Sequence, residues 1–404
     1  MKKKFGLILL AALLLLLTGT ALGETAADLT KQCIFHSLAK RYLYRLTDGK
    51  INVPYEGAKK REPWISVETP ADQPAYGVYV IWPYEGCPVV VESWNEGTNA
   101  WEEVIPMGVS GIAHEYAALP GLTKFRFRPT NEEGALKLCE LKVLGKGDVP
   151  DTVQVWRPIP DKADLMILSA HPDDEHLFMG GVMSHYANQG LQVEVVYLTY
   201  HNDKRLHELL NGLWIAGVRN YPIVYDFRDR YTASLKRGYD LWGRENVLDK
   251  VQQAIERLRP EVVVTHDVEG EYGHGAHRVC GDSCLTLIRD EERPLAWRPK
   301  KLYLHLWKEN PLVMDFRQPL ENLGGQTALE LAKEGFKAHV SQQGYDAPLK
   351  NGVKYKFRVD DEGMFSIASY GLAYSAVGVD TVGGDMFENI GEELLTTADG
   401  SAAH

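Results

Sequence analysis

Cysteine is scarce in this sequence, which has only five among 404 residues, and the scarcity limits how disulfides can stabilise the fold. An odd number allows at most two bridges and leaves one thiol over. We expect a bridge between Cys33 and Cys139, because it would close the amino-terminal region. Cys280 and Cys284 are four residues apart on a predicted helix, where disulfide geometry is unfavourable, so we expect them to be small buried side chains.

An excess of positive charge is also missing. The sequence has 44 Lys and Arg against 55 Asp and Glu, a formal net charge of -11, and no basic stripe. This balance argues against a protein built mainly to bind nucleic acid. The remaining composition, 45% hydrophobic and 25% charged, is ordinary for a globular protein, and the length is sufficient for two domains.

Long apolar runs are absent after residue 23. Residues 1–23 begin with Met and three lysines, continue with an apolar run up to Leu17 and end in small residues, which is typical of a secretory signal peptide. The run is shorter than the roughly 20 apolar residues of a membrane span. We therefore expect a secreted or cell-envelope protein with no membrane span in its mature form.

Two regions of the chain differ in how their apolar residues are spaced. Residues 26–147 contain short alternating runs, such as YGVYVIW at 76–82, separated by Gly, Pro and Asn, and this pattern predicts an all-β sandwich. In residues 163–390 apolar strands alternate with helical patterns, which predicts an α/β, Rossmann-like fold with a mostly parallel sheet and helices on both faces. We expect a linker at 148–162 and a disordered tail at 391–404.

The predicted secondary structure of the second region is specific enough to be checked. The continuous apolar character of LMILS and EVVVT indicates strands that are covered on both faces. The expected strands lie near 165–169, 191–199, 222–226, 261–266 and 301–307, and two of the expected helices lie at 205–217 and 245–259.

The first of these strands ends in a cluster of charge. Residues 165–181 read LMILSAHPDDEHLFMGG, so His171, Asp173, Asp174 and Glu175 all follow one buried strand. Because like charges repel and a carboxylate at a sheet edge loses hydration, the cluster needs either a compensating cation or open solvent. The alternative without chemistry is a capped helix start, since Asp is a favoured N-cap and acids suit the first turn.

A second polar cluster, THDVEGEYGHGAHRV at 265–279, follows a later strand. Ligands of an open parallel sheet bind outside the carboxyl ends of its strands, so we expect the two clusters to meet there. His171, Asp174 and His277 would then form a set of two imidazoles and one carboxylate with an open position. This set is typical of a catalytic zinc site, although another divalent metal would fit the same ligands.

Two other residues of the clusters are expected to take part in catalysis. Asp173 would act as the base that removes a proton from the attacking water. His274 would stabilise the oxyanion or protonate the leaving amine, so the parts together describe hydrolysis of an amide. Four histidines without such a context are interpreted as surface or supporting residues: His176, His185, His201 and His207.

With these motifs the sequence resembles the PIG-L/LmbE-like family of metal-dependent N-deacetylases. The resemblance extends over about residues 162–345 and rests on AHPDDE at 170–175, LTYHNDKRLHELLNGLWIAGV at 198–218, YDFRD at 225–229 and GEYGHGAH at 270–277. It implies zinc ligands at His171, Asp174 and His277, a general base at Asp173, an oxyanion partner at His274 and a substrate-binding arginine at Arg205.

The sequence departs from the family at one point. The family commonly has Pro-Asp between the two histidines of the second motif, where this chain has Gly275 and Ala276. We expect the missing carboxylate to weaken the orientation of His274 or the tuning of its pKa, and so to reduce or alter activity.

The expected function is an exported zinc-dependent deacetylase that acts on the N-acetyl group of an N-acetylglucosamine-type amino sugar or glycan. Two alternatives stay open, a hydrolase of another N-acyl amide and a catalytically impaired carbohydrate-binding protein on the same fold. Asp173 argues against the latter, because binding alone needs no free base.

The amino-terminal region resembles discoidin-like, galactose-binding-like sandwiches and is a candidate carbohydrate-binding module. Its aromatic side chains could stack on sugar faces, but large aromatics are usually buried, so we expect core packing for each of Trp64, Trp82, Trp94 and Trp101.

Overall fold

The structure is a computed structural model that describes residues 24–51, 53–57, 64–83, 86–131, 135–348 and 354–391. The expected signal peptide lies outside the described residues, as does all but the first residue of the expected tail. The chain forms two compact units, Met1–Gln154 and Val155–His404, which are described separately below.

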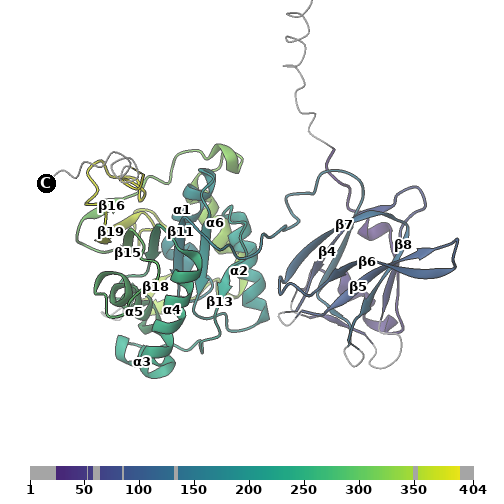
Figure 1. Cartoon of the computed structure of the whole chain (residues 1–404), viewed down its shortest axis with the longest axis horizontal. Coiled ribbons are helices and arrows are strands. Elements are labelled where there is room, and N and C mark those ends of the chain that lie inside the picture. Colours follow the sequence, from purple (N-terminus) through teal and green to yellow (C-terminus); the bar gives the residue numbers. More distant parts are fainter. Residues whose placement is uncertain are drawn as a thin grey trace, which may run out of the picture. The chain divides into compact units, whose positions relative to one another are not determined.

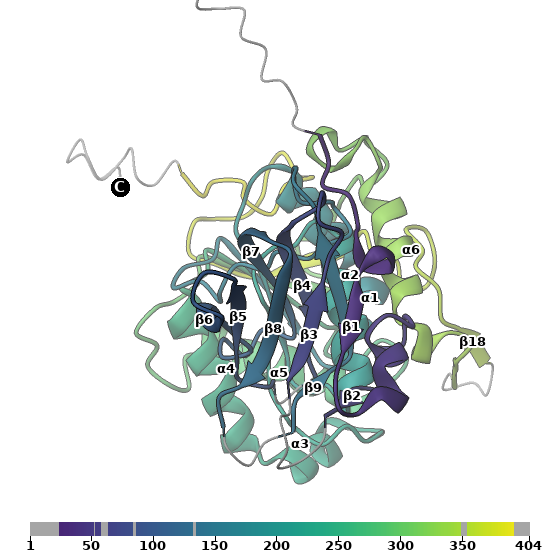
Figure 2. The ribbon, with the colours of Figure 1, turned by 90° about the vertical axis from the view of Figure 1, so that its right-hand side faces the viewer.

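The first unit is built from antiparallel strands. Alternate side chains of its two larger sheets, among them Val67, Val80 and Phe127, share one hydrophobic core. Figure 2 shows the larger sheet with its strands side by side. Its order is β1 (Ile34–His36), β3 (Ile65–Glu68), β8 (Lys124–Pro129), β5 (Val89–Asn95) and β6 (Ala100–Met107). The second sheet has the order β10 (Glu140–Leu144), β4 (Ala75–Ile81) and β7 (His114–Leu122), and β2 (Tyr55–Glu56) pairs with β9 (Lys137–Leu138).

The predicted disulfide is wrong. All five cysteines lie within the described residues, and none of them forms a disulfide. Cys33 packs against the core that the two sheets share, whereas Cys139 belongs to a separate cluster with Tyr79 and Val153. The two side chains therefore face different parts of the unit.

The expectation that every tryptophan of this unit packs in the core is confirmed only for Trp82, which is fully buried. Trp64, Trp94 and Trp101 are partly exposed. Trp94 and Trp101 are cross-strand neighbours next to the β5–β6 turn, with ring centroids 5.3 Å apart, and the Arg126 guanidinium lies 4.4 Å from the centre of the Trp101 ring. Neither ring belongs to the core that the two sheets share, which leaves both partly exposed.

The second unit has a seven-stranded sheet with helices on both faces, so the predicted α/β fold is confirmed. Figure 1 shows α1, α2 and α6 on one side of the sheet and α3, α4 and α5 on the other. The sheet has the order β13 (Ile223–Val224), β12 (Val193–Tyr197), β11 (Leu165–Ser169), β14 (Val262–Thr265), β15 (Lys301–His305), β19 (Ser369–Ser375) and β16 (Pro311–Val313). The helices are α1 (Asp174–Asn188), α2 (Asp203–Ile215), α3 (Leu235–Trp242), α4 (Arg244–Leu258), α5 (Gly275–Cys284) and α6 (Ala328–Ala338).

The first five strands of this order are parallel, and all five were predicted. Each end lies within two residues of its predicted position. β19 runs antiparallel to both β15 and β16. Side chains such as Met166, Leu168 and Val263 pack with α4 and α5 in one core, which also buries Cys280 and Cys284 as expected. A short hairpin of β17 (Asp346–Pro348) and β18 (Lys354–Lys356) follows α6.

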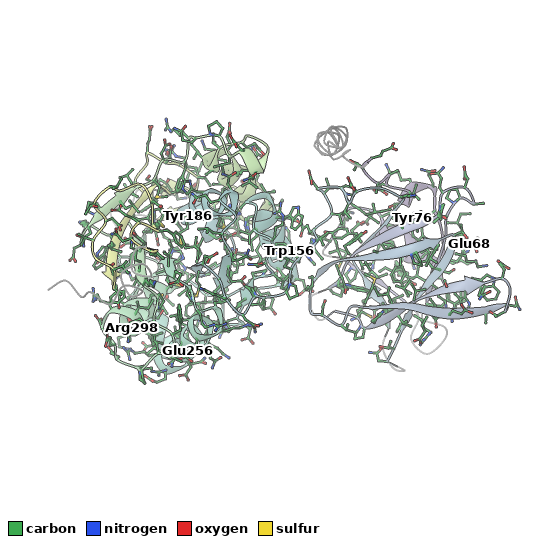
Figure 3. All side chains as sticks on the ribbon, turned by 45° about the horizontal axis from the view of Figure 1, so that its top comes forward. Glu68, Tyr76, Trp156, Tyr186, Glu256 and Arg298 are labelled. Carbon is green, nitrogen blue, oxygen red and sulfur yellow. The ribbon has the colours of Figure 1, made fainter. Side chains whose placement is uncertain are left out.

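Trp156 and Tyr186, both labelled in Figure 3, attach the two ends of this unit. The ring of Trp156 packs edge-on against Trp214 and Tyr221, so this part of the expected linker belongs to the α/β unit. The buried Tyr186 hydroxyl donates to the Asp385 carboxylate at 3.0 Å, which attaches the carboxy-terminal segment to α1. In the described part of the chain, no helix is both long and apolar enough to cross a membrane.

Candidate active site

The two polar clusters follow neighbouring strands, since β11 pairs with β14 in parallel register. The chain crosses from one face of the sheet to the other between these strands, and ligands of open α/β sheets bind at such a switch point. A pocket of about 370 Å³ lies there. Its lining includes five of the predicted site residues, His171, Asp173, Asp174, Arg205 and His274, and the sixth, His277, is fully buried beside them.

The three predicted metal ligands lie together. One ligand atom from each of His171, Asp174 and His277 is within 4.8 Å of the others. The Asp174 Oδ2 atom is 2.8 Å from His171 Nδ1 and 3.2 Å from His277 Nε2. Two buried nitrogens here, His171 Nε2 and His277 Nε2, make no hydrogen bond with the described residues. Unpaired imidazole nitrogens beside a carboxylate fit a divalent cation, because such nitrogens are otherwise costly to bury.

The charges around the three ligands favour a cation at the same point. Burial disfavours an ionised Asp174, yet His277 and His171 hold the pKa of its carboxyl well below the usual range. Burial likewise opposes protonation of His277, but Asp174 and Glu271 raise the pKa of its imidazole to about 10. A positive charge is therefore stabilised between the carboxylates, and a metal ion would supply that charge.

Glu271 is a functional candidate that the sequence analysis did not identify, although its motif was singled out. The side chain is fully buried, and its Oε2 atom lies 2.6 Å from His277 Nδ1. Its Oε1 atom lies 3.1 Å from His266 Nδ1 and 3.0 Å from His305 Nδ1. A carboxylate that accepts from Nδ1 fixes the orientation of the ring, so His277 Nε2 is directed at Asp174 and is the atom that would bind a metal there.

Asp173 points away from the ligand set and toward Arg205. The guanidinium Nη2 atom donates to Asp173 Oδ1 at 2.8 Å and also to the Pro172 carbonyl, and Nη1 lies 3.3 Å from Asp229 Oδ2. Burial raises the pKa of Asp173 to about 7, although the nearby Arg205 charge lowers it. A carboxylate with a pKa near neutrality, held in one orientation beside a pocket, suits a general base.

The backbone of Asp173 is strained, with φ of 117°, and hydrogen bonds with neighbouring residues stabilise this conformation. Glu175 Oε2 accepts the Asp173 backbone N–H at 2.8 Å, and Glu175 Oε1 lies 2.8 Å from His339 Nε2. Glu175 was assigned no chemistry from the sequence, and here it fixes the position of the candidate base. Arg205 also holds Asp173 through its hydrogen bond to Oδ1, in addition to lining the pocket.

His274 is the N-cap of α5, and its Nδ1 atom accepts the backbone N–H of Ala276 at 3.0 Å. Burial, together with His171 and His277, holds the pKa of His274 far below its usual value, so the ring is neutral. A neutral ring that accepts at Nδ1 carries its proton on Nε2 and can donate it as a hydrogen bond to an oxyanion. The backbone thus orients His274 without a carboxylate at position 276.

Gly275, the first of the two residues that depart from the family pattern, allows a close approach of two chain segments. Its N–H donates to the Thr232 carbonyl at 2.6 Å. A Cβ atom at this position would lie 2.5 Å from the Ser234 carbonyl oxygen and would also overlap the Thr232 hydroxyl. The segment before α3 carries Tyr231, whose ring packs edge-on against His274 at 4.9 Å. Gly275 therefore contributes to the shape of the pocket.

We predict that Gly275→Ala lowers the free energy of unfolding by about 2 kcal/mol, because the new methyl group overlaps backbone atoms that cannot rotate away. Denaturant unfolding of the wild type and the variant measures the difference. Gly391→Ala is the matched control, since a Cβ atom there meets nothing within 4 Å, and its effect should stay within about 0.5 kcal/mol. Equal losses for both variants would contradict the close approach at Gly275.

The remaining histidines were interpreted as surface or supporting residues. His201 is exposed and His185 is half-buried, whereas His176 and His207 are fully buried, so for these two only the supporting role stays a prediction. They sit on the inner faces of α1 and α2, where helical spacing turns them away from solvent. His176 lies in a buried group with Glu175 and His339.

Part of the second unit matches a known protein family. A family model described as "PIG-L: GlcNAc-PI de-N-acetylase" matches residues 166–288. A 1D-myo-inositol 2-acetamido-2-deoxy-alpha-D-glucopyranoside deacetylase of Mycobacterium leprae is 33% identical over 142 residues, which cover 28% of this chain and 46% of the relative. The enzyme of the same name from Mycobacterium tuberculosis is 32% identical over 142 residues, which again cover 28% of this chain and 46% of the relative. The chain thus spans about half the length of the curated relatives it matches.

Solved structures also resemble this chain in part. The conserved protein TT1542 from Thermus thermophilus is 22% identical, with a TM-score of 0.35 over 45% of this chain and 80% of that one. The N,N'-diacetylchitobiose deacetylase from Pyrococcus horikoshii is 18% identical, with a TM-score of 0.34 over 45% of this chain and 71% of that one. The roles of the individual site residues stay predictions that the geometry makes testable.

Proposed function

The chain contains a PIG-L domain at residues 166–288, and from this premise we propose that the protein is a metal-dependent hydrolase of the N-acetyl group of an N-acetylglucosamine-type amino sugar or glycan. The observation that carries the proposal is a juxtaposition in one pocket. A group of two imidazoles and a carboxylate with unpaired ligand nitrogens lies next to a carboxylate, Asp173, that a separate partner holds.

His171, Asp174 and His277 would hold the metal, and we propose zinc because two imidazoles, one carboxylate and an open position suit its catalytic sites. When bound, such an ion polarises the amide carbonyl and lowers the pKa of a water. Asp173, oriented by Arg205, accepts the proton of the attacking water at its carboxylate. His274 donates from Nε2 to the carbonyl oxygen as negative charge develops on it.

The proton then has to reach the amine that leaves. Asp173 carries this proton after the attack, and its pKa of about 7 allows it to pass the proton to the amine nitrogen as the C–N bond breaks. The products are acetate and the free amino sugar. The name of the Mycobacterium leprae relative, which specifies a 2-acetamido-2-deoxy-glucopyranoside, supports an amino sugar as the substrate class.

Acetate release tests the proposal directly. The zinc-loaded wild type would be incubated with N-acetylglucosamine and its oligomers, and acetate and free amine would be quantified together. We expect both products in equal amounts. If another N-acyl amide released its acid and N-acetyl sugars released none, the protein would be a hydrolase of that amide and not a deacetylase. If the protein bound glycans but released no acid from any of them, it would be a carbohydrate-binding protein.

Metal binding is predicted to depend on His277. We expect His277→Gln to lose the bound metal after dialysis, since an amide cannot replace the imidazole between Asp174 and Glu271, whereas the exposed His36→Gln should keep it. Elemental analysis of both variants measures the metal content. If His277→Gln kept the metal content of the wild type, His277 would not be a metal ligand.

We also propose an exported protein, supported by the lysine-rich, apolar sequence of residues 1–23. For the first unit we propose a discoidin-like sandwich that contacts carbohydrate. Its partly exposed Trp94 and Trp101 support this role, because aromatic rings stack on the apolar faces of sugars.

A further inference from the structure

The candidate active site does not end at the pocket that holds the catalytic residues. A second hollow of about 740 Å³, twice the volume of the first, is lined mainly by the loop before α6, by α6 itself and by residues 357–359. Phe357 lines both hollows. The neighbouring residues Gln342 and Gln343 line one hollow each. The two hollows therefore adjoin along a ridge made by Phe357 and these glutamines.

The ridge and the pocket rim carry aromatic rings. Phe357 packs edge-on against Tyr272 at 5.3 Å, and its N–H donates to the Tyr345 carbonyl. Tyr345 and Tyr231, which line the first pocket, are 59% and 54% exposed, unusually high for rings of this size. Exposed rings at the mouth of a pocket offer flat apolar faces of the kind on which sugar rings stack.

The charges of the second hollow favour an uncharged occupant. Lys337 is paired with Glu334 at 2.6 Å, and Arg358 is paired with Asp360 at 2.7 Å. Glu330 is committed to the capping box of α6. Lys333 lines the hollow as well, so its three cationic side chains are balanced by three carboxylates, those of Glu330, Glu334 and Asp360. This balance leaves hydrogen-bonding groups but little net charge for a ligand, and it suits hydroxyl and acetamido groups better than phosphate.

We propose that the second hollow binds the non-reacting sugar units of an uncharged glycan, so that the protein acts on oligomers of N-acetylhexosamine in preference to the monosaccharide. The inference rests on the proposed deacetylase function and specifies its substrate. The first pocket is near the lower end of the roughly 300–1,000 Å³ typical of ligand sites, so it has room for the reacting unit and little more. The residues of the second hollow lie at 324–359, beyond the residues 166–288 that the family model matches.

The test compares kcat/KM for acetate release from N-acetylglucosamine, its dimer and its tetramer. We expect the tetramer to exceed the monomer at least tenfold. Phe357→Ala should reduce the tetramer-to-monomer ratio by about tenfold, because it removes the ring shared by both hollows. Phe387→Ala is the matched control, since Phe387 is also a partly buried phenylalanine of the second unit and packs on Tyr186 without lining either hollow. Gln326→Trp, which adds bulk in the second hollow alone, should slow the tetramer and spare the monomer.

Calorimetric binding of the same sugars, which needs no turnover, separates failure of this inference from failure of the proposed function. Equal kcat/KM and equal affinity for monomer and tetramer would overturn the extended site even if acetate is released. Absence of acetate release from every sugar, with tighter binding of the tetramer that Phe357→Ala weakens, would overturn the deacetylase activity and leave the extended glycan site in place.

Discussion

Asp173→Asn is expected to lower kcat for acetate release by about 10³-fold, within the range of roughly 10²–10⁴ for loss of a general acid or base. The change removes proton acceptance and little else. Asn has the same shape, its amide oxygen can still accept from Arg205 Nη2, and its backbone N–H still donates to Glu175. Asn also tolerates positive φ about as well as Asp, which matters at φ of 117°.

Metal content and kcat have to be measured on the same Asp173→Asn preparation. Asp173 points toward Arg205 and not toward the ligand set, so the metal content should equal that of the wild type. The matched control is Asp203→Asn, an exposed carboxylate in the first turn of α2, which should change kcat less than twofold by the usual effect of a surface substitution. A fully loaded Asp173→Asn that keeps more than about a tenth of the wild-type kcat would exclude Asp173 as the base.

The part of the site that follows strand ends could be predicted from the sequence. The strand at 165–169 has the predicted bounds, because five consecutive apolar residues before a charged turn leave little freedom for a strand covered on both faces. Parallel strands place their carboxyl ends at one edge of the sheet. This rule correctly predicted that His171 and His277 lie close together, although they are 106 positions apart in the chain. Local pattern and topology were sufficient there.

The rest of the site depends on contacts that no local pattern encodes. Glu271 bonds to His305, which lies 34 positions away on β15, and only the sheet order makes them neighbours. Gln342, Tyr345 and Phe357 line the pocket, although the sequence around them has no apolar periodicity that would predict this. The disulfide prediction failed for a related reason: the spacing of Cys33 and Cys139 does not specify which side of a sheet each faces.

Glu271→Gln is expected to weaken metal binding by about 10- to 100-fold and to lower the free energy of unfolding by about 3 kcal/mol. The buried carboxylate accepts from His277 through Oε2 and from His266 and His305 through Oε1. An amide has only one oxygen. If its NH₂ group faces His277, the ring must accept at Nδ1 and carry its proton on Nε2, the atom that would otherwise bind the metal.

Stability falls in the same variant for an electrostatic reason. The negative charge of Glu271 is held by the surrounding imidazoles, which keep the pKa of its carboxyl well below the usual range in spite of burial. Removing that charge leaves His277 in a fully buried position with one carboxylate, Asp174, instead of two, and a buried network that loses one charged member is destabilised.

Competition with a chromophoric chelator gives the metal Kd of Glu271→Gln, and thermal unfolding with and without metal gives its stability. Glu269→Gln is the control, because its side chain is 68% exposed two positions earlier in the same turn, and its Kd should match that of the wild type. A normal Kd with reduced stability would make Glu271 a structural residue only. A weakened Kd with kcat restored at saturating metal would instead show that Glu271 acts by fixing the orientation of His277, which is the role that the geometry predicts.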